Sequence, residues 1–166
     1  MGWKGSENAG VRFPGNRSVW RMGRYLNSIS PYRKYQAVVT DTYFVDKTAL
    51  IEELLPALGK EKRYFCITKP RRFGKTVMAN MAASFFGKGI DSSDLFQKLK
   101  IAGSDHYREH LNQHNVIYID FSEIPRKCQD YQQYIQRIEE GIIRDLLETY
   151  PEVRNDAEEA VWDILT

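Results

Sequence analysis

Residues 69 to 76 read Lys69-Pro70-Arg71-Arg72-Phe73-Gly74-Lys75-Thr76, and this stretch decides how the rest of the chain is interpreted. A short β-branched and aromatic run, Arg63 to Thr68, precedes it and predicts a buried strand. An apolar stretch from about Lys75 to Phe86 follows it and predicts a helix that Gly87 ends. A Gly-Lys-Thr turn between a strand and a helix is the context in which the phosphate-binding pattern G-x-x-x-x-G-K-[ST] is informative.

The chemistry of such a loop gives each residue type a role. Backbone amides and the positive end of the helix dipole attract phosphate oxygens, and Gly74 lets the backbone approach because it has no Cβ. Lys75 is expected to contact the β- and γ-phosphates, while the Thr76 hydroxyl is expected to hold Mg²⁺. We therefore predict that residues 69 to 76 bind ATP with Mg²⁺. A basic turn in which Gly-Lys-Thr occurs by chance is the alternative.

The order of the predicted elements indicates the fold class. A helix at Lys47 to Leu55, capped by Asp46, comes before the first strand and the helix after the loop. Two short helices, a second strand at Val116 to Phe121 and a long helix at about Gln129 to Tyr150 come after them. This order predicts an α/β fold, an incomplete P-loop NTPase-like three-layer sandwich with parallel strands. Two strands alone leave an open sheet edge, so self-association through that edge is also expected.

Four stretches carry a family resemblance: Tyr43 to Ile51, Thr68 to Thr76, Leu95 to Ile101 and Val116 to Asp120. They resemble a bacterial AAA-ATPase-like family whose members usually end in a PD-(D/E)xK nuclease-like domain. The family's variant of the Walker A loop reads RPRRFGK[ST], with a basic residue at the first glycine. Lys69 departs from the general motif but is close to this variant. The likeness extends from about Met22 to Pro151.

The resemblance implies an AAA-like ATPase that binds ATP through residues 69 to 76, with Lys75 stabilising phosphate charge. In the family the Walker B acids follow the long helix, and nothing after Tyr150 matches them, so we expect weak or absent turnover. Residues 22–166 are interpreted as the N-terminal part of such a domain, hence a fragment, and residues 1–21 as a basic leader or disordered tail. The alternative is a truncated or decayed, non-enzymatic P-loop module with an interaction or regulatory role.

Asp120 is the candidate second ligand for Mg²⁺, because it ends an apolar run as a Walker B aspartate does. By the order of the family's elements that run is not the acid-bearing strand, so a turn residue at a strand end is the alternative. Asp46, Lys47 and Thr48 are expected on the base or ribose side of the nucleotide, with helix capping as the alternative for Asp46.

Composition narrows the remaining function classes. Hydrophobic residues make up 42% and charged residues 28% of the chain, and no apolar run is long enough to cross a membrane. Cys66 and Cys128 form no disulfide framework, so a reduced, cytoplasmic chain is expected. The net charge is +2, but residues 1–35 hold seven Lys or Arg against Glu7 alone. Such an arm permits nucleic-acid contact through phosphates, although a solvated tail is the plainer interpretation.

A second motif lies in the second of the two short predicted helices, Asp105 to Gln113. His106 to His110 fits H-x-x-E-H, and His114 adds a third imidazole one turn later. Residues four apart share a helix face, as metal ligands must. The flanking residues are polar and offer little apolar wall, so a solvated helix is the favoured interpretation and a metalloprotease site the weaker one.

Overall fold

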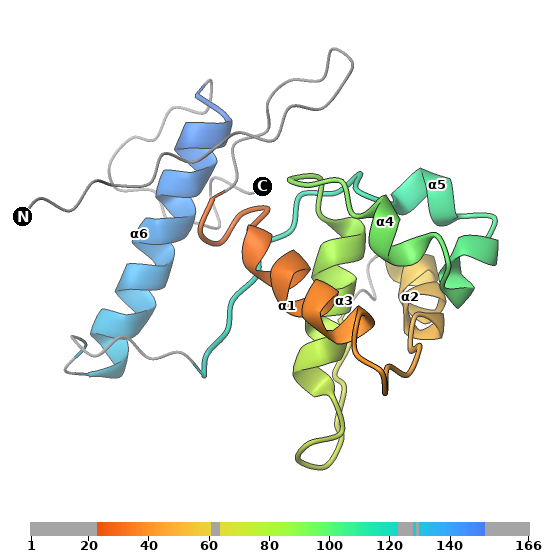
Figure 1. Ribbon diagram of the computed structural model, residues 1–166. Coiled ribbons are helices and arrows are strands. Elements are labelled where there is room, and N and C mark those ends of the chain that lie inside the picture. The colour runs from red at the N-terminus through yellow and green to blue at the C-terminus, as the bar shows by residue number, and fades with distance from the viewer. Residues whose placement is uncertain (1–22, 61–63, 123–127, 129, 152–166) are drawn as a thin grey trace, which may run out of the picture.

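Figure 1 shows the computed structural model, which describes residues 23–60, 64–122, 128 and 130–151. Predictions that fall on other residues, among them the basic leader, lie outside the described part. The regular elements are α1 (Ile29–Val39), α2 (Ala49–Leu54), η1 (Leu55–Ala57), α3 (Lys75–Phe86), α4 (Ser93–Phe96), η2 (Lys100–Gly103), α5 (Tyr107–His110) and α6 (Tyr131–Thr149). Within these residues every regular element is helical, and no helix is both long and apolar enough to span a membrane.

The predicted α/β sandwich with parallel strands is therefore wrong. Residues 64–70 are exposed and adopt no regular structure, and Val116 to Asp120 makes only one isolated bridge, between Ile117 and Leu26. The backbone of this second run bonds instead to residues 25–27, through Asn27 N to Val116 O at 2.8 Å and Tyr118 N to Tyr25 O at 3.0 Å. A strand needs a partner for its N–H and C=O groups, and an apolar run does not specify that partner. Self-association through an open sheet edge, which was predicted from these strands, has no sheet among the described residues to support it.

The main hydrophobic core surrounds α3. Its Phe85 is fully buried, and α1 packs along the same helix, as Figure 1 shows. Tyr35 of α1 stacks on Phe96 of α4 with ring centroids 5.4 Å apart, and Phe85 meets Phe96 edge-on at 5.3 Å. Aromatic pairs of this kind contribute about 0.5–1.5 kcal/mol beyond the burial of their area. α3 spans the residues that the sequence predicts, and this helix is confirmed.

A second, smaller cluster is built on α6. The buried residues of α6 recur at helical spacing: Tyr134, Ile138, Ile142 and Leu146. Helical spacing in the sequence predicts that Leu147 faces inward with these four residues; the prediction is confirmed for the four, while Leu147 is only half-buried. The buried face packs against Leu26 with Ile117 alongside. The buried Asp145 carboxylate accepts hydrogen bonds from Tyr25 N at 2.6 Å and Leu26 N at 3.2 Å. These two amides offset the cost of burying its polar oxygens, so α6 is tied to the start of the described chain.

Candidate functional site

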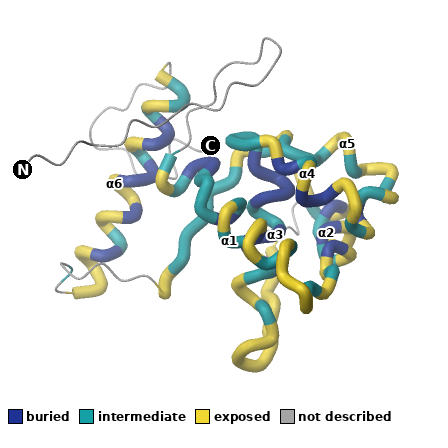
Figure 2. The backbone as a smooth tube through the Cα atoms, in the orientation of Figure 1, coloured by how far each residue is buried: buried dark blue, intermediate teal, exposed yellow. Residues whose placement is uncertain are grey.

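The loop of residues 69 to 76 projects from the body at the start of α3. Figure 1 shows the loop extending beyond the end of the helix, and Figure 2 colours residues 64–73 as exposed along their length. Phe73 N donates to Pro70 O at 3.4 Å, which closes a turn before the helix begins. The predicted loop is thus neither continuous strand nor continuous helix, and its last two residues, Lys75 and Thr76, begin α3.

Gly74 gives the loop its final bend. It is the N-cap of α3 with φ 80° and ψ 24°, a left-handed conformation in which a Cβ is strained. Arg72 is also left-handed, with φ 69°, although it carries a side chain. Non-glycine residues in this region cost on the order of 1–2 kcal/mol, and such strain gathers at functional sites. The two left-handed residues are two positions apart, directly before the first residue of α3.

The first amides of α3 have no partner in the described part of the chain. The helical ladder starts with Met78 N, which donates to Gly74 O at 2.9 Å, and no described group accepts from the amides of residues 75–77. Amides at a helix start that lack an internal partner carry the positive end of the helix dipole. They therefore form a small cluster of donors at the loop, of the kind that binds anions.

Lys75 folds back across the loop. Its Nζ donates to Lys69 O at 2.6 Å and to Pro70 O at 3.1 Å, so the ammonium lies over the first two residues of the loop. The side chain remains exposed, and a solvated ammonium can exchange one set of acceptors for another. The charge of Lys75 therefore lies over the loop and does not extend away from it into solvent.

A second lysine reaches the same place from the segment before α2. Lys47 Nζ donates to Phe73 O at 3.4 Å, and it lies 3.1 Å from the position that a Cβ on Gly74 would take. The sequence prediction put Lys47 on the base or ribose side of a nucleotide, whereas its ammonium contacts the loop itself. The family resemblance contained a signal, because it paired the stretch around Lys47 with the loop motif.

Asp46 fixes the backbone next to Lys47. Its carboxylate accepts from Thr48 N at 2.8 Å, from Thr48 Oγ1 at 2.7 Å and from Lys100 N at 2.8 Å. Burial alone raises the pKa of Asp46, but the hydrogen bonds from Lys100 and Thr48 outweigh it and leave the pKa below its ordinary value. α2 starts at Ala49, two residues later than predicted, so Asp46 holds the turn before the helix rather than its first residue.

The loop carries an excess of positive charge. Lys69, Arg71 and Arg72 are exposed, as are Lys75 and Lys47, and no carboxylate pairs with any of them among the described residues. Clustered cations without counter-charges raise the local concentration of polyanions. Because the aromatic ring of Phe73 is also exposed, at 59%, the loop presents both charge and an apolar surface to solvent.

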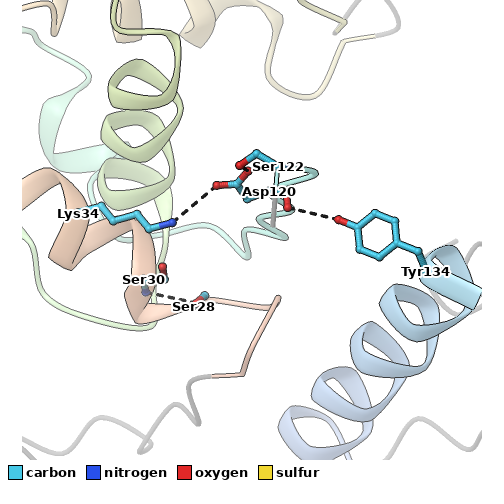
Figure 3. A network of polar contacts seen from close by, with 6 residues as sticks. All are labelled: Ser28, Ser30, Lys34, Asp120, Ser122 and Tyr134. Atoms are coloured by element: carbon cyan, nitrogen blue, oxygen red, sulfur yellow. Dashed lines mark hydrogen bonds and ion pairs between the residues drawn. The ribbon is translucent and has the colours of Figure 1, made fainter. Parts of the chain in front are cut away.

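Asp120 is engaged elsewhere, as Figure 3 shows. Its carboxylate accepts from Ser122 Oγ at 2.5 Å and from Ser122 N at 3.0 Å, and it pairs with Lys34 Nζ at 3.7 Å. The side-chain and backbone hydrogen bonds from Ser122, with the charge of Lys34, hold the pKa of Asp120 below its ordinary value. Within the described residues no hydrogen bond or ion pair joins Asp120 to Thr76 or to any part of the loop.

A comparison with protein-family models matches residues 29–165 to a family described as predicted AAA-ATPase. The chain belongs to this family. Searches of curated proteins and of solved structures find no match. The match of this AAA-ATPase-like chain begins at the first residue of α1 and includes the loop of residues 69 to 76 and α6, whereas Leu26 of the second cluster precedes it. A bacterial origin and a nuclease-like partner domain remain predictions from the resemblance.

Sequence reasoning missed one supporting residue of this AAA-ATPase-like chain. Asn112 has φ 55°, and its amide nitrogen donates to Gly87 O at 2.8 Å and to Ser84 O at 3.3 Å, at the far end of α3. Its Oδ1 accepts from Ser92 N at 3.0 Å. A left-handed Asn directly after a short helix is the signal that could have found it, because Asn tolerates this conformation better than most residues.

Proposed function

We propose that this AAA-ATPase-like chain binds the phosphate groups of Mg·ATP in the loop of residues 69 to 76. One observation carries the proposal: the ammonium of Lys75 folds over the carbonyls of Lys69 and Pro70, in the same loop that ends at amides of α3 with no described partner. Amide donors with an adjacent lysine suit the charge and hydrogen-bonding needs of a polyphosphate. Lys47 supplies a second ammonium at the same loop.

Binding would rearrange the contacts of Lys75. Phosphate oxygens would replace the carbonyls of Lys69 and Pro70 as acceptors, and charged acceptors give hydrogen bonds roughly twice as strong as neutral ones. The left-handed Gly74 leaves room for close approach of the backbone, and the exposed hydroxyl of Thr76 is the Mg²⁺ ligand in this proposal. Arg71 and Arg72 add positive charge around the phosphates.

We propose that the chain binds ATP but hydrolyses it slowly or not at all. Hydrolysis needs an acid or amide that orients water, besides the cations that stabilise the transferred phosphoryl group. Asp120 is held by Ser122 and Lys34, which favours a structural role over a catalytic one. This observation also supports the alternative function, an interaction or regulatory module in which the bound nucleotide acts as a ligand rather than a substrate.

The test is a ligand-induced shift in thermal unfolding of the full chain. Mg·ATP at about 100 times its dissociation constant should stabilise the wild type by about 2.7 kcal/mol. Lys75→Ala should lose this stabilisation and Lys47→Ala should weaken it, because each removes an ammonium from the loop. Lys98→Ala is the matched control, since it removes an exposed lysine after α4 and should respond as the wild type does. Equal responses of wild type and Lys75→Ala would refute the proposal.

Two further arms separate the competing roles. Inorganic tripolyphosphate in place of ATP reports whether the loop recognises the phosphate chain alone. Asp120→Asn in the Mg·ATP assay should behave as wild type if Thr76 is the protein ligand of the metal, and a selective loss of Mg²⁺ dependence would instead assign Asp120 a metal role. A phosphate-release assay then distinguishes an ATPase from a binding module.

A further inference from the structure

A second cluster of chemically active side chains lies on and beside α5. His106 Nδ1 is 3.2 Å from Glu109 Oε2, and His110 Nε2 is 3.9 Å from the same oxygen. One donor atom from each of the three residues lies within 4.8 Å of the others. Two imidazole nitrogens and one carboxylate oxygen form a donor set that zinc-class ions accept in proteins.

We propose that His106, Glu109 and His110 bind a divalent ion of the zinc class. Ligand atoms around a tetrahedral ion with bonds of about 2.0–2.2 Å lie roughly 3.3–3.6 Å apart. The His106–Glu109 and His110–Glu109 separations bracket this range, and all three donor atoms lie within 4.8 Å of one another, so small side-chain rotations would close the site. Three protein ligands leave a fourth position for water or another small ligand.

His114 gives the site a supporting contact. His110 Nδ1 and His114 Nε2 are 2.9 Å apart, a hydrogen bond whose direction depends on the tautomers. With the proton on Nδ1 of His110, this bond leaves Nε2, the nitrogen that faces Glu109, ready to bind a metal. Metal-bound histidines usually donate their second ring nitrogen to a fixed acceptor, which sets the tautomer and the orientation of the ring.

The supporting residue is itself held in place. His114 N donates to Phe86 O at 2.9 Å, and its carbonyl accepts from Lys88 N at 2.9 Å. The His114 ring also meets Phe86 edge-on, with centroids 5.5 Å apart, and stacks on His110 at 5.1 Å. His114 is therefore anchored at the end of α3, and through it the ring of His110 is positioned.

The segment around α5 has an apolar wall on one side, although its sequence is mostly polar. The segment is not a fully solvated helix, because Tyr107 and Leu111 pack against the main core and the His110 side chain is only 17% exposed. His106 and Glu109 remain open to solvent at 63% and 66%. The cluster thus has a buried wall on one side and free access on the other, as a site that loads its metal from solution requires.

Co²⁺ titration of the full, tag-free chain, followed by visible absorbance, tests the proposal. A Cys66→Ser, Cys128→Ser background removes thiolates that would compete as ligands. We expect one Co²⁺ per chain, displaced by Zn²⁺, and at least a tenfold loss of affinity in His106→Ala, Glu109→Gln and His110→Ala. Arg108→Ala is the control, since it changes an exposed residue of the same helix. His114→Gln should weaken binding less than the loss of a ligand does.

The outcomes are distinct. Absence of a Co²⁺ spectrum in the wild type, or equal affinity in wild type and His110→Ala, would overturn the site. Far-ultraviolet circular dichroism of each metal-free variant checks that the exposed substitutions leave the fold intact. Lys75→Ala should bind Co²⁺ as the wild type does, so this inference stands or fails independently of the nucleotide proposal.

Discussion

The two ends of α3 differ: its first residues are exposed to solvent, whereas its last residues are buried in the core. The first end carries an exposed loop with left-handed Arg72 and Gly74, and the lysines beside it have no carboxylate partners within the described chain. The last end carries Phe85 and Phe86, which are 0% and 8% exposed, and the side chain of Asn112 satisfies the carbonyls there. One helix thus joins a solvent-exposed loop to the buried core.

This contrast explains how an exposed loop can hold a defined geometry. Lys75 and the amides of residues 75–77 are positioned by the helix they begin, and the helix is fixed by the packing of its other end. Binding residues are often carried on loops whose scaffold is rigid, and precision of the site depends on that scaffold. Substitutions at the closed end should therefore change stability, and those at the open end should change binding.

The largest expected effect is at the closed end. Phe85→Ala should lower the free energy of unfolding by about 3–5 kcal/mol, because it removes a fully buried ring and leaves a cavity. Its ring contacts with Phe96 and Tyr107 are lost at the same time. Urea unfolding measures the change, and Tyr43→Ala is the control because that side chain is 90% exposed. A similar small loss in both variants would mean that the core is not centred on this end of α3.

Substitution of Asn112 should produce the next largest loss of stability. Asn112→Ala leaves Gly87 O and Ser92 N without their side-chain partner and should cost about 1–3 kcal/mol. Asn112→Gly separates two causes, because glycine tolerates φ 55° but makes none of these hydrogen bonds. If the hydrogen bonds dominate, both variants lose similar stability in urea unfolding. Full stability of Asn112→Gly would show instead that backbone conformation is the important property.

At the open end, Gly74→Ala should cost about 1–2 kcal/mol through its left-handed backbone. Its new Cβ would also lie 3.1 Å from Lys47 Nζ, so the second ammonium must move. Gly59→Ala is a matched control, because Gly59 has φ 73° but nothing within 4 Å of the added Cβ. Both variants should lose similar stability, yet only Gly74→Ala should lose Mg·ATP binding in isothermal titration. Equal binding by the two would argue against close backbone approach at the loop.

The same contrast shows what could be predicted from the sequence. The bounds of α3 and the buried face of α6 follow from helical periodicity, which is a local property, and both are confirmed. The parallel strands were wrong, because the backbone of Val116 to Tyr118 bonds to residues 25–27 rather than to another strand. The choice of partner is non-local, and no spacing within the apolar run specifies it.

Some residues of the candidate site could be predicted from a local motif, and others depend on contacts between distant parts of the chain. Gly74, Lys75 and the start of the helix are contiguous, so the motif alone located them. The contact of Lys47 with Phe73 spans 26 positions, and that of Asn112 with Gly87 spans 25. Such contacts depend on how α2 and the chain after α5 pack around α3. The role of the loop residues in nucleotide binding stays a prediction, as does that of Asp120 in metal binding.

The smallest expected effect is a dependence on pH at Asp46, which supports the segment that carries Lys47. Its pKa is lower in the folded chain than its ordinary value, so the folded state favours the carboxylate. The resulting stability is therefore fully present above the unfolded pKa of about 3.9 and is lost as pH falls through the lower, folded pKa. In Asp46→Asn this contribution is absent at every pH.

Urea unfolding of the two proteins between about pH 7 and pH 3 measures the difference, and other titrating groups cancel in the comparison. The wild type should be the more stable protein at neutral pH, and the gap should narrow below about pH 4. A gap that is constant with pH would mean that the hydrogen bonds to Thr48 and Lys100 do not depend on the charge of Asp46. In that case packing of the turn, and not the charge of the Asp46 carboxylate, would hold the neighbouring Lys47 in place.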